Sequence, residues 1–313
     1  MSEEVIQIDN KETAANPCGT SQKGLIINPG ALGDCILTLP LAEFMVKMLG
    51  IKSMDFAGQP GCIDFFPART CITRSRPIDS IDFYRLFVDH DEFTLLEKDT
   101  LPFAFAGYDW IVSFLGEKDS DFEKNLILTV YSTHSAEISI LPLFQEDSPN
   151  FHISEFYIKK FIEENHLEVP DFQLNLNTQL IKPIQADFQW SKQLLASAGI
   201  SADEKIAIIQ PGSGGRQKCW HLDNYIHIAA DLKESGFLPI FLLGPAENEK
   251  FTQQQIQKIQ STGKTFSSLN IKQAFQLITA SCAYIGNDSG TTHLAAASGI
   301  KTTAIFGPTC HKT

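Results

Sequence analysis

One stretch of twelve residues places several chemically useful side chains around the start of a helix. The run from Gly286 to Ala297, Gly-Asn-Asp-Ser-Gly-Thr-Thr-His-Leu-Ala-Ala-Ala, follows an apolar, strand-like segment and ends in an alanine-rich helix. Free N–H groups and the positive dipole end of a helix attract phosphate, Gly290 permits close backbone approach, and Asp288 can accept hydrogen bonds from sugar hydroxyls. The run predicts a ligand site, although Asp288 or Ser289 alone could be an ordinary N-cap.

A second turn has the composition of an anion-binding loop. The segment from Pro211 to Lys218, Pro-Gly-Ser-Gly-Gly-Arg-Gln-Lys, comes directly after an apolar strand and precedes a helix. Its backbone amides, that of Gly214 included, can surround an oxyanion together with Ser213, while Lys218 supplies positive charge. It is not the phosphate loop of nucleoside triphosphatases, because Cys219 stands where that loop has a hydroxyl residue. A flexible turn is the structural alternative.

Acidic residues begin two further helices. Asp34 follows the turn Gly30-Ala-Leu-Gly33 at the end of the strand 24–28. A carboxylate there could take a proton from an attacking hydroxyl, and the structural alternative is a tight turn with Asp34 as the N-cap. Glu247 follows Leu-Gly-Pro-Ala after another strand and is either a ribose ligand or an acid stabilised by the helix dipole.

The bulk composition is that of a soluble globular protein. A chain of 313 residues predicts about two domains, and 20% charged with 43% apolar residues is ordinary for such a protein. No apolar run approaches the roughly 20 residues of a membrane span, and the acidic start is unlike a signal peptide, so we expect a cytoplasmic protein. Seven cysteines are scattered without a Cys-x-x-Cys pair, which predicts neither a metal site nor a disulfide framework.

The net charge of −12 is unevenly distributed. Residues 1–200 contain 15 basic and 29 acidic residues, a net charge of −14, whereas residues 201–313 contain 10 and 8, a net charge of +2. Nucleic acid is excluded as a partner because neither part has the basic face that neutralises phosphates. The main positive feature of the acidic part is the set Arg69, Arg74 and Arg76, and most such sets are solvated surface.

Strand-like and helical segments alternate along the chain. Apolar strands are expected at 24–28, 52–57, 108–114, 205–209, 239–243, 282–286 and 302–306, and helices at 34–48, 154–164, 223–235, 247–260, 271–280 and 290–298. The alternation predicts an α/β fold of doubly wound parallel sheets, with ligands at the carboxyl ends of the strands. We expect a polar leader at 1–23, an N-terminal domain at 24–180, a linker region at 181–200 and a C-terminal domain at 201–313.

Together these segments resemble the glycosyltransferase family nine heptosyltransferases, which use ADP-heptose to build the lipopolysaccharide inner core. The matching stretches are Pro29–Asp34 with Leu37–Pro40, Tyr108–Val112, Gln210–Trp220, Leu242–Glu247, and Gly286–Ala297 with Ala304–Thr309. They follow one another across residues 24–309; the C-terminal pair is the specific part, and the resemblance is weak through the interior at 55–200.

The resemblance implies a GT-B fold, two Rossmann-like domains facing a cleft, with the acceptor in the N-terminal domain and the nucleotide sugar in the C-terminal domain. It implies that Asp34 is the general base and Glu247 a ribose ligand. The implied donor site further comprises Ser213, Gly214, Lys218, Asp288, Ser289, Gly290 and His293, and the expected acceptor side comprises Gly33, Arg69, Arg74 and Arg76.

The implied reaction is inverting transfer from a nucleotide-diphosphate sugar, ADP-heptose in the family, to a hydroxyl of a glycan or glycolipid. Lys218 and the loop dipoles could stabilise the leaving diphosphate without an obligatory metal or cofactor. Membrane contact, if any, is peripheral and at the inner face of the cytoplasmic membrane. The alternatives are a non-catalytic nucleotide-sugar-binding protein and a GT-B sugar-nucleotide epimerase; a Rossmann dehydrogenase is disfavoured because no Gly-x-Gly-x-x-Gly follows a strand.

The sequence departs from the family pattern in three ways, two of which concern the acceptor and one the end of the sequence. Asn28-Pro29 stands where relatives carry an arginine-containing segment. The acidic first part predicts an acceptor that is neutral or that meets the protein only at a local basic spot such as Arg69, Arg74 and Arg76. GT-B enzymes continue into a helix that crosses back to the first domain, whereas this sequence stops at Thr313, as expected for a shortened protein or a fragment.

Overall fold

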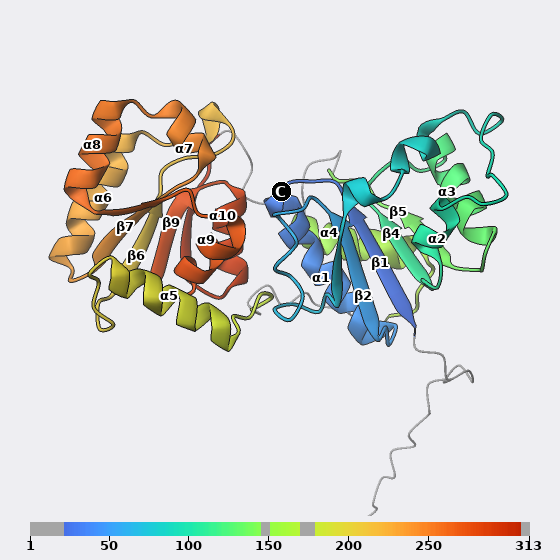
Figure 1. The fold of residues 1–313 in the computed structure, drawn as a ribbon, viewed down its shortest axis with the longest axis horizontal. Coiled ribbons are helices and arrows are strands. Elements are labelled where there is room, and N and C mark those ends of the chain that lie inside the picture. The colour runs from blue at the N-terminus through green and yellow to red at the C-terminus, as the bar shows by residue number, and fades with distance from the viewer. Residues whose placement is uncertain (1–21, 145–150, 170–178, 308–313) are drawn as a thin grey trace, which may run out of the picture.

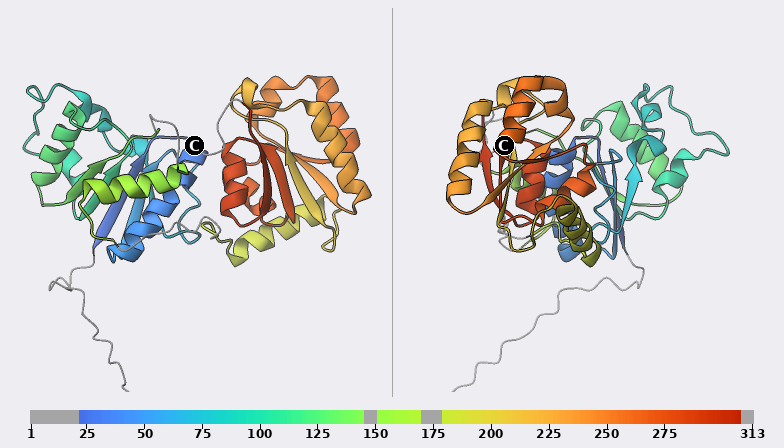
Figure 2. Two further views of the ribbon diagram at one scale, coloured as in Figure 1. Left: turned by 180° about the vertical axis from the view of Figure 1, so that it is seen from behind. Right: turned by 60° about the vertical axis from the view of Figure 1, so that its left-hand side comes forward.

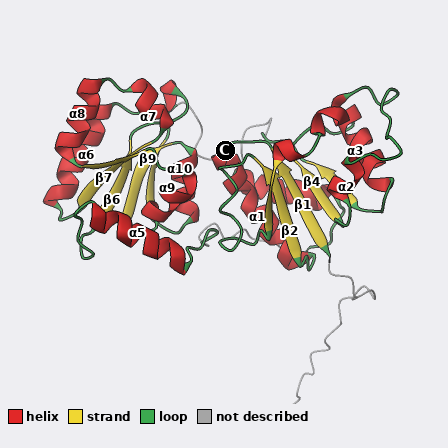
Figure 3. Ribbon diagram, viewed as in Figure 1, coloured by secondary structure: helices red, strands yellow, loops and turns green. Residues whose placement is uncertain are grey.

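The computed structural model of the chain describes residues 22–144, 151–169 and 179–307. These residues form two five-stranded parallel β-sheets flanked by helices (Figures 1 and 3). The strand orders are β3-β2-β1-β4-β5 and β10-β9-β6-β7-β8, so the chain winds outward in both directions from a central strand of each sheet. The predicted class of doubly wound parallel α/β units is therefore confirmed. The predicted polar leader lies almost entirely outside the described residues.

The first sheet is built around β1. Its strands are β1 (Lys23–Asn28), β2 (Ser53–Gly58), β3 (Arg74–Pro77), β4 (Trp110–Ser113) and β5 (Glu137–Ile140). The connecting helices are α1 (Leu32–Met48), α2 (Leu101–Phe105), α3 (Asp121–Tyr131) and α4 (Ile153–Glu164), with short 3₁₀ turns η1 (Ile78–Ser80) and η2 (Phe83–Phe87).

Alternation along the buried strands assigns the helices to two faces. Leu25 and Ile27 of β1 pack in one cluster with Phe105 of α2 and Leu126 of α3. Ile26, between them, belongs to the other cluster with residues of α1 and α4. Because successive side chains of a strand point to opposite faces, α1 and α4 cover one face of the sheet, and α2 and α3 cover the other.

The second sheet is built around β6 and β9. Its strands are β6 (Ile206–Gln210), β7 (Leu238–Leu243), β8 (Lys264–Ser267), β9 (Ala283–Asn287) and β10 (Lys301–Ile305). Its helices are α5 (Gln185–Ser197), α6 (Leu222–Glu234), α7 (Pro245–Lys250), α8 (Gln253–Thr262), α9 (Ile271–Ile278) and α10 (Gly290–Ala297), with the 3₁₀ turn η3 (Arg216–Lys218). Helices α6 and α8 pack on one face, and α9 and α10 on the other.

The two sheets are joined through their helices. Helix α1 packs against α10, and both belong to one continuous apolar cluster that includes residues of both sheets. The rings of Phe65 and Phe275 add a contact across this junction, with centroids 5.4 Å apart. The views in Figure 2 show α10 and α9 on the side of the second unit that faces α1. The carboxyl ends of β1 and β9, from which α1 and α10 start, therefore lie at a common boundary.

Several details differ from the sequence-based expectations. Helix α1 begins at Leu32 and includes Asp34 as its third residue, and the expected helix 247–260 is two helices, because the chain is extended at Phe251 and Thr252. The expected linker region 181–200 contains α5, which packs against α9. The pattern missed α5 because Asp187 and Ser191 are its only buried residues. The edge strands β3, β5 and β8 were missed because they are short and half polar.

None of the helices in the described ranges is long and apolar enough to cross a bilayer.

A buried ion pair links the two units. The guanidinium of Arg69, 7% exposed, donates from Nε and Nη2 to the two carboxylate oxygens of Asp187 on α5 at 2.8 and 2.7 Å. Gln276 and the Ile184 N–H donate to the same carboxylate. Burial acts to raise the pKa of Asp187, but these hydrogen bonds outweigh it and hold the pKa below its ordinary value. Arg69, expected at the acceptor side, is thus engaged in joining the units.

Breaking this pair is expected to destabilise the protein strongly. Asp187→Asn leaves a buried guanidinium without its counter-charge, which should cost about 3–5 kcal/mol in urea unfolding. The double variant Arg69→Met/Asp187→Leu should recover part of the loss, because it removes the unpaired charge but leaves Gln276 and the Ile184 N–H without their acceptor. Glu43→Gln, which removes an exposed pair with Lys47, is the control and should cost under about 0.5 kcal/mol.

The difference between wild type and Asp187→Asn should begin to shrink only below about pH 4, where the carboxylate becomes protonated in the unfolded chain, and should disappear as the pH falls through the lowered pKa of the folded carboxylate. A variant within about 1 kcal/mol of wild type at pH 7 would contradict the structural role of the pair.

Candidate active site

The turn from β1 into α1 fixes the position of Asp34. Asn28 is fully buried at the end of β1; its Oδ1 accepts from the Gly30 N–H at 2.8 Å and its Nδ2 donates to Thr38 Oγ1 at 2.8 Å. Asp34 Oδ2 accepts from the Ala31 N–H at 2.9 Å, so the carboxylate closes the first turn of the helix from its third position. A Cβ at Gly30 would lie 2.6 Å from that of Asp34. The turn therefore requires glycine and presents a half-buried carboxylate.

On the other unit, the carboxylate of Asp288 lies between two basic groups. Lys218 Nζ donates to Asp288 Oδ2 at 2.7 Å, and His293 Nε2 is 3.6 Å from Oδ1. The Ser213 hydroxyl donates to the Asp288 carbonyl oxygen at 2.7 Å. The loop after β6 is thereby tied to the loop after β9, and the side chain of Lys218 remains about a third exposed.

Asn287 is the buried centre of these two loops. Its Oδ1 accepts from the Trp220 N–H at 2.9 Å and from the Tyr225 hydroxyl at 2.7 Å, while its Nδ2 donates to the Pro211 carbonyl at 2.7 Å. Sequence reasoning passed over this residue and chose its neighbour Asp288. The available signal was its place as the last residue of a strand, where a buried amide can connect adjacent loops.

Helix α7 holds the glycine-rich loop from the side. Both oxygens of Glu247, 1% exposed, accept backbone N–H groups, from Gly212 at 2.9 Å and from Gly244 at 2.8 Å. One turn later, Lys250 Nζ donates to the carbonyls of Ser213 and Gly214, each at 2.8 Å. Sequence reasoning did not single out Lys250. These contacts make the short helix a clamp on the loop that begins with Gly212.

The start of α10 touches the start of α1. Ser289 is the N-cap of α10, and its side chain accepts from the Thr292 N–H. A Cβ on Gly290 would lie 3.0 Å from Leu32 Cβ and 3.2 Å from the Gly33 nitrogen, and a Cβ on Gly33 would lie 3.2 Å from the His293 ring. The backbones of the two turns are thus in contact, and two helix N-termini with their free N–H groups converge there.

The groups around Asp34 are held in their neutral forms. Burial, followed by the charge of Asp34, raises the pKa of the Tyr157 hydroxyl. Burial, followed by the charges of Asp64 and Asp34, raises the pKa of the Cys62 thiol. His152 caps α4; burial and then the neighbouring His293 lower its pKa, so the ring is neutral at pH 7 and its Nδ1 accepts from the Ser154 N–H. The role of Asp34 as a base stays a prediction.

The structure collects most of the residues predicted to form a site. The donor-side set lies on the loops that follow β6, β7 and β9 and on the short helical segments that these loops enter: Ser213, Gly214, Lys218, Glu247, Asp288, Ser289, Gly290 and His293. Gly33 and Asp34 lie on the turn that meets α10. Arg69 is in the ion pair with Asp187, whereas Arg74 and Arg76 lie on the face of the first sheet that carries α2. The ligand roles of these residues remain predictions.

Comparison with known proteins identifies the class. The described chain has the GT-B architecture of solved glycosyltransferases. Its TM-score to a glycosyl transferase family 9 protein of Veillonella parvula is 0.68, at 15% identity over 93% of this chain and 82% of that one. Its TM-score to ADP-heptose lipopolysaccharide heptosyltransferase II of E. coli is 0.64, at 18% identity over 93% of this chain and 86% of that one. The model of glycosyltransferase family 9 (heptosyltransferase) matches residues 157–313. The chain belongs to this family.

Two curated relatives are similar over part of the sequence. Lipooligosaccharide heptosyltransferase 2 of Campylobacter jejuni serotype O:2 is 36% identical over 110 residues, 34% of each chain. The same enzyme of serotype O:6 is 31% identical over 166 residues, which are 51% of this chain and 49% of that protein. The chain thus matches about a third to a half of the length of these relatives.

The clamp on the glycine-rich loop gives a testable expectation. Lys250→Met keeps the length of the side chain but removes two charge-assisted hydrogen bonds, so the amides of residues 212–215 should exchange with deuterium at least about tenfold faster. Lys250→Arg should restore protection because it keeps donors and charge. Lys258→Met on α8, whose ammonium pairs with exposed Asp223, is the control. Unchanged exchange in Lys250→Met would show that Lys250 does not hold the glycine-rich loop.

Proposed function

We propose that the protein is an inverting glycosyltransferase that moves a heptose-like sugar from a nucleotide-diphosphate sugar to a hydroxyl of a cell-surface glycan or glycolipid. Membership of glycosyltransferase family 9 supports transferase chemistry, and the observation that carries the finer proposal is the contact of the Gly33 turn with the Gly290 turn. This contact supports the proposal, because the turn that carries Asp34 touches the helix start that follows the Asp288 loop. The proposed place of action is the cytoplasm, up to the inner face of its membrane.

The donor is proposed to bind at the loops of the second unit. Its diphosphate would meet the ammonium group of Lys218, the amides of Gly214 and Gly290, and the hydroxyls of Ser213 and Ser289, a combination of charge and fixed dipoles that favours anions. Asp288 and His293 are the remaining residues of the proposed donor site. The expectation that Glu247 binds ribose stays a prediction, because both its oxygens already accept N–H groups that position the loops. ADP-heptose is the proposed donor, and support comes from structures of the E. coli heptosyltransferase WaaC with ADP and with ADP-2-deoxy-2-fluoro heptose, which have TM-scores of 0.58 and 0.56 to this chain.

The reaction follows from this arrangement as a single displacement. The Asp34 carboxylate takes the proton of the acceptor hydroxyl while its oxygen forms a bond to the anomeric carbon. The bond from that carbon to the diphosphate oxygen breaks at the same time, and the leaving nucleoside diphosphate keeps the electron pair. Attack from the face opposite the leaving group inverts the configuration. Lys218 and the loop amides stabilise the charge that develops on the diphosphate, so no metal is required in this proposal.

Removing the charges of the donor loops should weaken nucleotide binding while the fold survives. Lys218→Ala and Asp288→Ala should each lower ADP affinity roughly tenfold to a hundredfold, as expected for a lost charge-assisted contact. Lys258→Ala is the control, since it removes one exposed positive charge of the same unit. Calorimetry with ADP, UDP and GDP measures the effect and the base preference. Unchanged ADP affinity in both loop variants would show that the donor does not bind at these loops.

Replacing the proposed base should abolish turnover without loss of structure. In Asp34→Asn the amide oxygen can still accept from the Ala31 N–H, but it cannot take a proton. Release of ADP from ADP-heptose in the presence of a glycan acceptor should fall about a hundredfold to ten-thousandfold, with ADP affinity and melting temperature little changed. Asp64→Asn, which changes an exposed carboxylate that accepts from the Gly61 N–H, is the control.

Other outcomes separate the rival functions. Near-normal transfer by Asp34→Asn would show that Asp34 is structural. Donor binding without turnover, even with a verified acceptor, would indicate a non-catalytic nucleotide-sugar-binding protein. Conversion of the donor sugar in the absence of any acceptor would indicate an epimerase.

A further inference from the structure

A hollow of about 660 Å³ lies on the outer side of α3, in the first unit. Helix α3 forms one side of it, and the segment that follows η2 contributes His90 and Leu95 to the other. Figure 1 places α3 at the end of the first unit that is remote from α10 and the proposed donor loops. We call this hollow the α3 groove; it is lined by His90, Leu95, Lys124, Ile127, Leu128, Tyr131 and Ser132.

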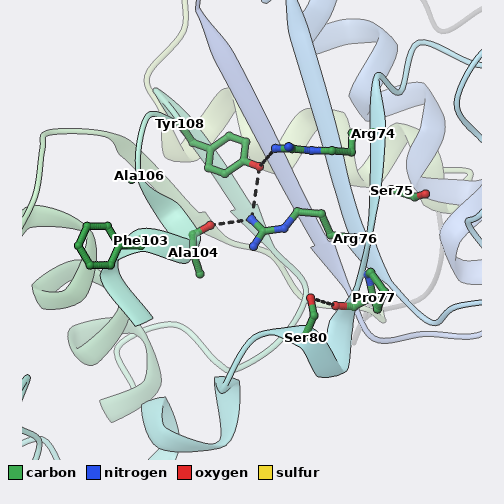
Figure 4. Close-up of a pocket in the computed structure, with 9 residues that line it drawn as sticks. All are labelled: Arg74, Ser75, Arg76, Pro77, Ser80, Phe103, Ala104, Ala106 and Tyr108. Carbon is green, nitrogen blue, oxygen red and sulfur yellow. Dashed lines mark hydrogen bonds between the residues drawn. The ribbon is translucent and has the colours of Figure 1, made fainter. Parts of the chain in front are cut away.

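The α3 groove is separate from the hollow at the edge strand β3. In that other hollow Arg74 and Arg76 converge on Tyr108 (Figure 4), and neither arginine lines the α3 groove. The one ammonium group that lines the α3 groove belongs to Lys124, which pairs with Asp121 at 3.3 Å. The groove therefore has no unbalanced positive charge of its own.

The floor of the groove is apolar although it faces solvent. Leu128 and Tyr131, 44% and 59% exposed, lie one turn apart on α3. The core side of the same helix is already filled by buried Phe122, Leu126 and Val130. Helix α3 thus has apolar side chains on two faces, and the outer face is uncovered within the described part of the chain. Clustered apolar residues on a surface typically mark a binding site.

A hydrogen-bond acceptor is available in the same groove. Asn125 Nδ2 donates to the carbonyls of Leu86 and Val88 at 3.1 and 2.9 Å, so its Oδ1 can only accept. His90 Nδ1, 2.7 Å from this oxygen, is therefore the protonated nitrogen of the neutral ring. Its Nε2 is then an acceptor, and the described residues offer it no donor. An N–H group of a partner would satisfy it.

The rim of the groove is acidic. The segment 89–92 carries three exposed carboxylates, Asp89, Asp91 and Glu92, none of which is in an ion pair within the described ranges. More widely, residues 78–131 contain 12 acidic and 4 basic residues, a net charge of −8. The electrostatic potential around the groove is therefore negative, which attracts a cationic partner and repels an anionic one.

This charge distinguishes among the possible occupants of the groove. A bilayer that contains anionic lipids would be repelled. A second copy of the chain, with a net charge of −12, would bring the same acidic rim, and residues 1–21 contain four acidic residues and one basic residue. An amphipathic helix with lysine or arginine beside its apolar face matches both properties of the groove, because such a helix buries its apolar side chains while its cations meet the rim.

We propose that the α3 groove docks a basic amphipathic helix of a second protein. The apolar face of that helix packs on Leu128 and Tyr131, its cations lie against the carboxylates of segment 89–92, and one of its N–H groups meets His90 Nε2. The groove lies away from the turn that carries Asp34, so the partner leaves the proposed active site open.

The test uses two model peptides that differ only in charge. One is a fluorescently labelled peptide of about 14 leucine and lysine residues, patterned as an amphipathic helix, and the other has glutamate in place of lysine. Each is titrated with the full chain and followed by fluorescence anisotropy. The lysine peptide should bind, added salt should weaken it, and the glutamate peptide should not bind.

Variants with two substitutions assign the binding to the floor and to the rim of the groove. Leu128→Ser/Tyr131→Ser should lower the affinity for the lysine peptide at least about tenfold. Asp91→Asn/Glu92→Gln should lower it about threefold and reduce its salt dependence. All these side chains are exposed, so melting temperature and ADP affinity should not change.

The matched controls are in the second unit. Phe188→Ser removes an exposed aromatic side chain on α5, and Asp231→Asn/Glu234→Gln removes two exposed carboxylates of α6. Both controls should bind the lysine peptide as wild type does.

Several results would overturn the proposal. The first group is no binding of the lysine peptide, equal binding of the glutamate peptide, or binding that Leu128→Ser/Tyr131→Ser leaves unchanged. Sedimentation of the wild type, but not of this variant, with vesicles of phosphatidylcholine and phosphatidylglycerol would identify a membrane as the occupant. A dimer in sedimentation equilibrium that the same variant dissociates would identify a second copy of the chain.

Discussion

The contact between Gly33 and Gly290 is the constraint on which the arrangement of the proposed site depends. Each glycine lies in the first turn of a helix, and a side chain on either one would press on the backbone or side chains of the other turn. The packing of α1 on α10, the shared apolar cluster and the Arg69–Asp187 pair hold the turns together. As a result, the turn that carries Asp34 in one unit meets, at one place, the loops of the other unit that we propose to bind the diphosphate.

Within the second unit, a buried polar network decides the shape of the donor loops. Asn287 connects three backbone segments, and Glu247 and Lys250 hold the glycine-rich loop through its N–H and carbonyl groups. Buried polar groups of this kind are costly unless every one is paired, so the network favours a single loop conformation. The Lys218–Asp288 pair rests on this network, and the side chain of Lys218 remains partly exposed.

The sequence predicted those parts of the fold that have a strong local signal. The buried central strands and the helices with apolar faces were predicted because their side-chain periodicity is clear. The edge strand Arg74–Pro77 was not predicted, because an edge strand with two arginines has no apolar alternation. Helix α5 was missed because its main buried group is Asp187, a carboxylate whose burial is offset by Arg69, 118 residues earlier in the chain.

In the candidate site, too, the sequence predicted features with a local signal and missed those that depend on tertiary contacts. Motif spacing singled out the loops after β6 and β9 as candidates. It could not show that Asp34 is the third residue of its helix, because the exact start depends on Asn28 holding Gly30. Motif spacing also could not distinguish the different contacts of three arginines that are close together in the sequence. Arg69 joins the units, Arg74 neutralises Asp55, and Arg76 is left with backbone and hydroxyl partners. Such differences come from tertiary contacts, which one sequence does not reveal.

The central claim is that the two turns form one catalytic site, and a crystal structure with a non-reactive fluorinated ADP-heptose tests it most directly. The account predicts the diphosphate at Lys218 and the loop amides, with the anomeric carbon within about 6 Å of the Asp34 carboxylate, close enough for one hydroxyl oxygen to touch both. The face of the sugar opposite the diphosphate should point to Asp34. A diphosphate bound away from Lys218, or an anomeric carbon beyond about 10 Å from Asp34, would contradict it.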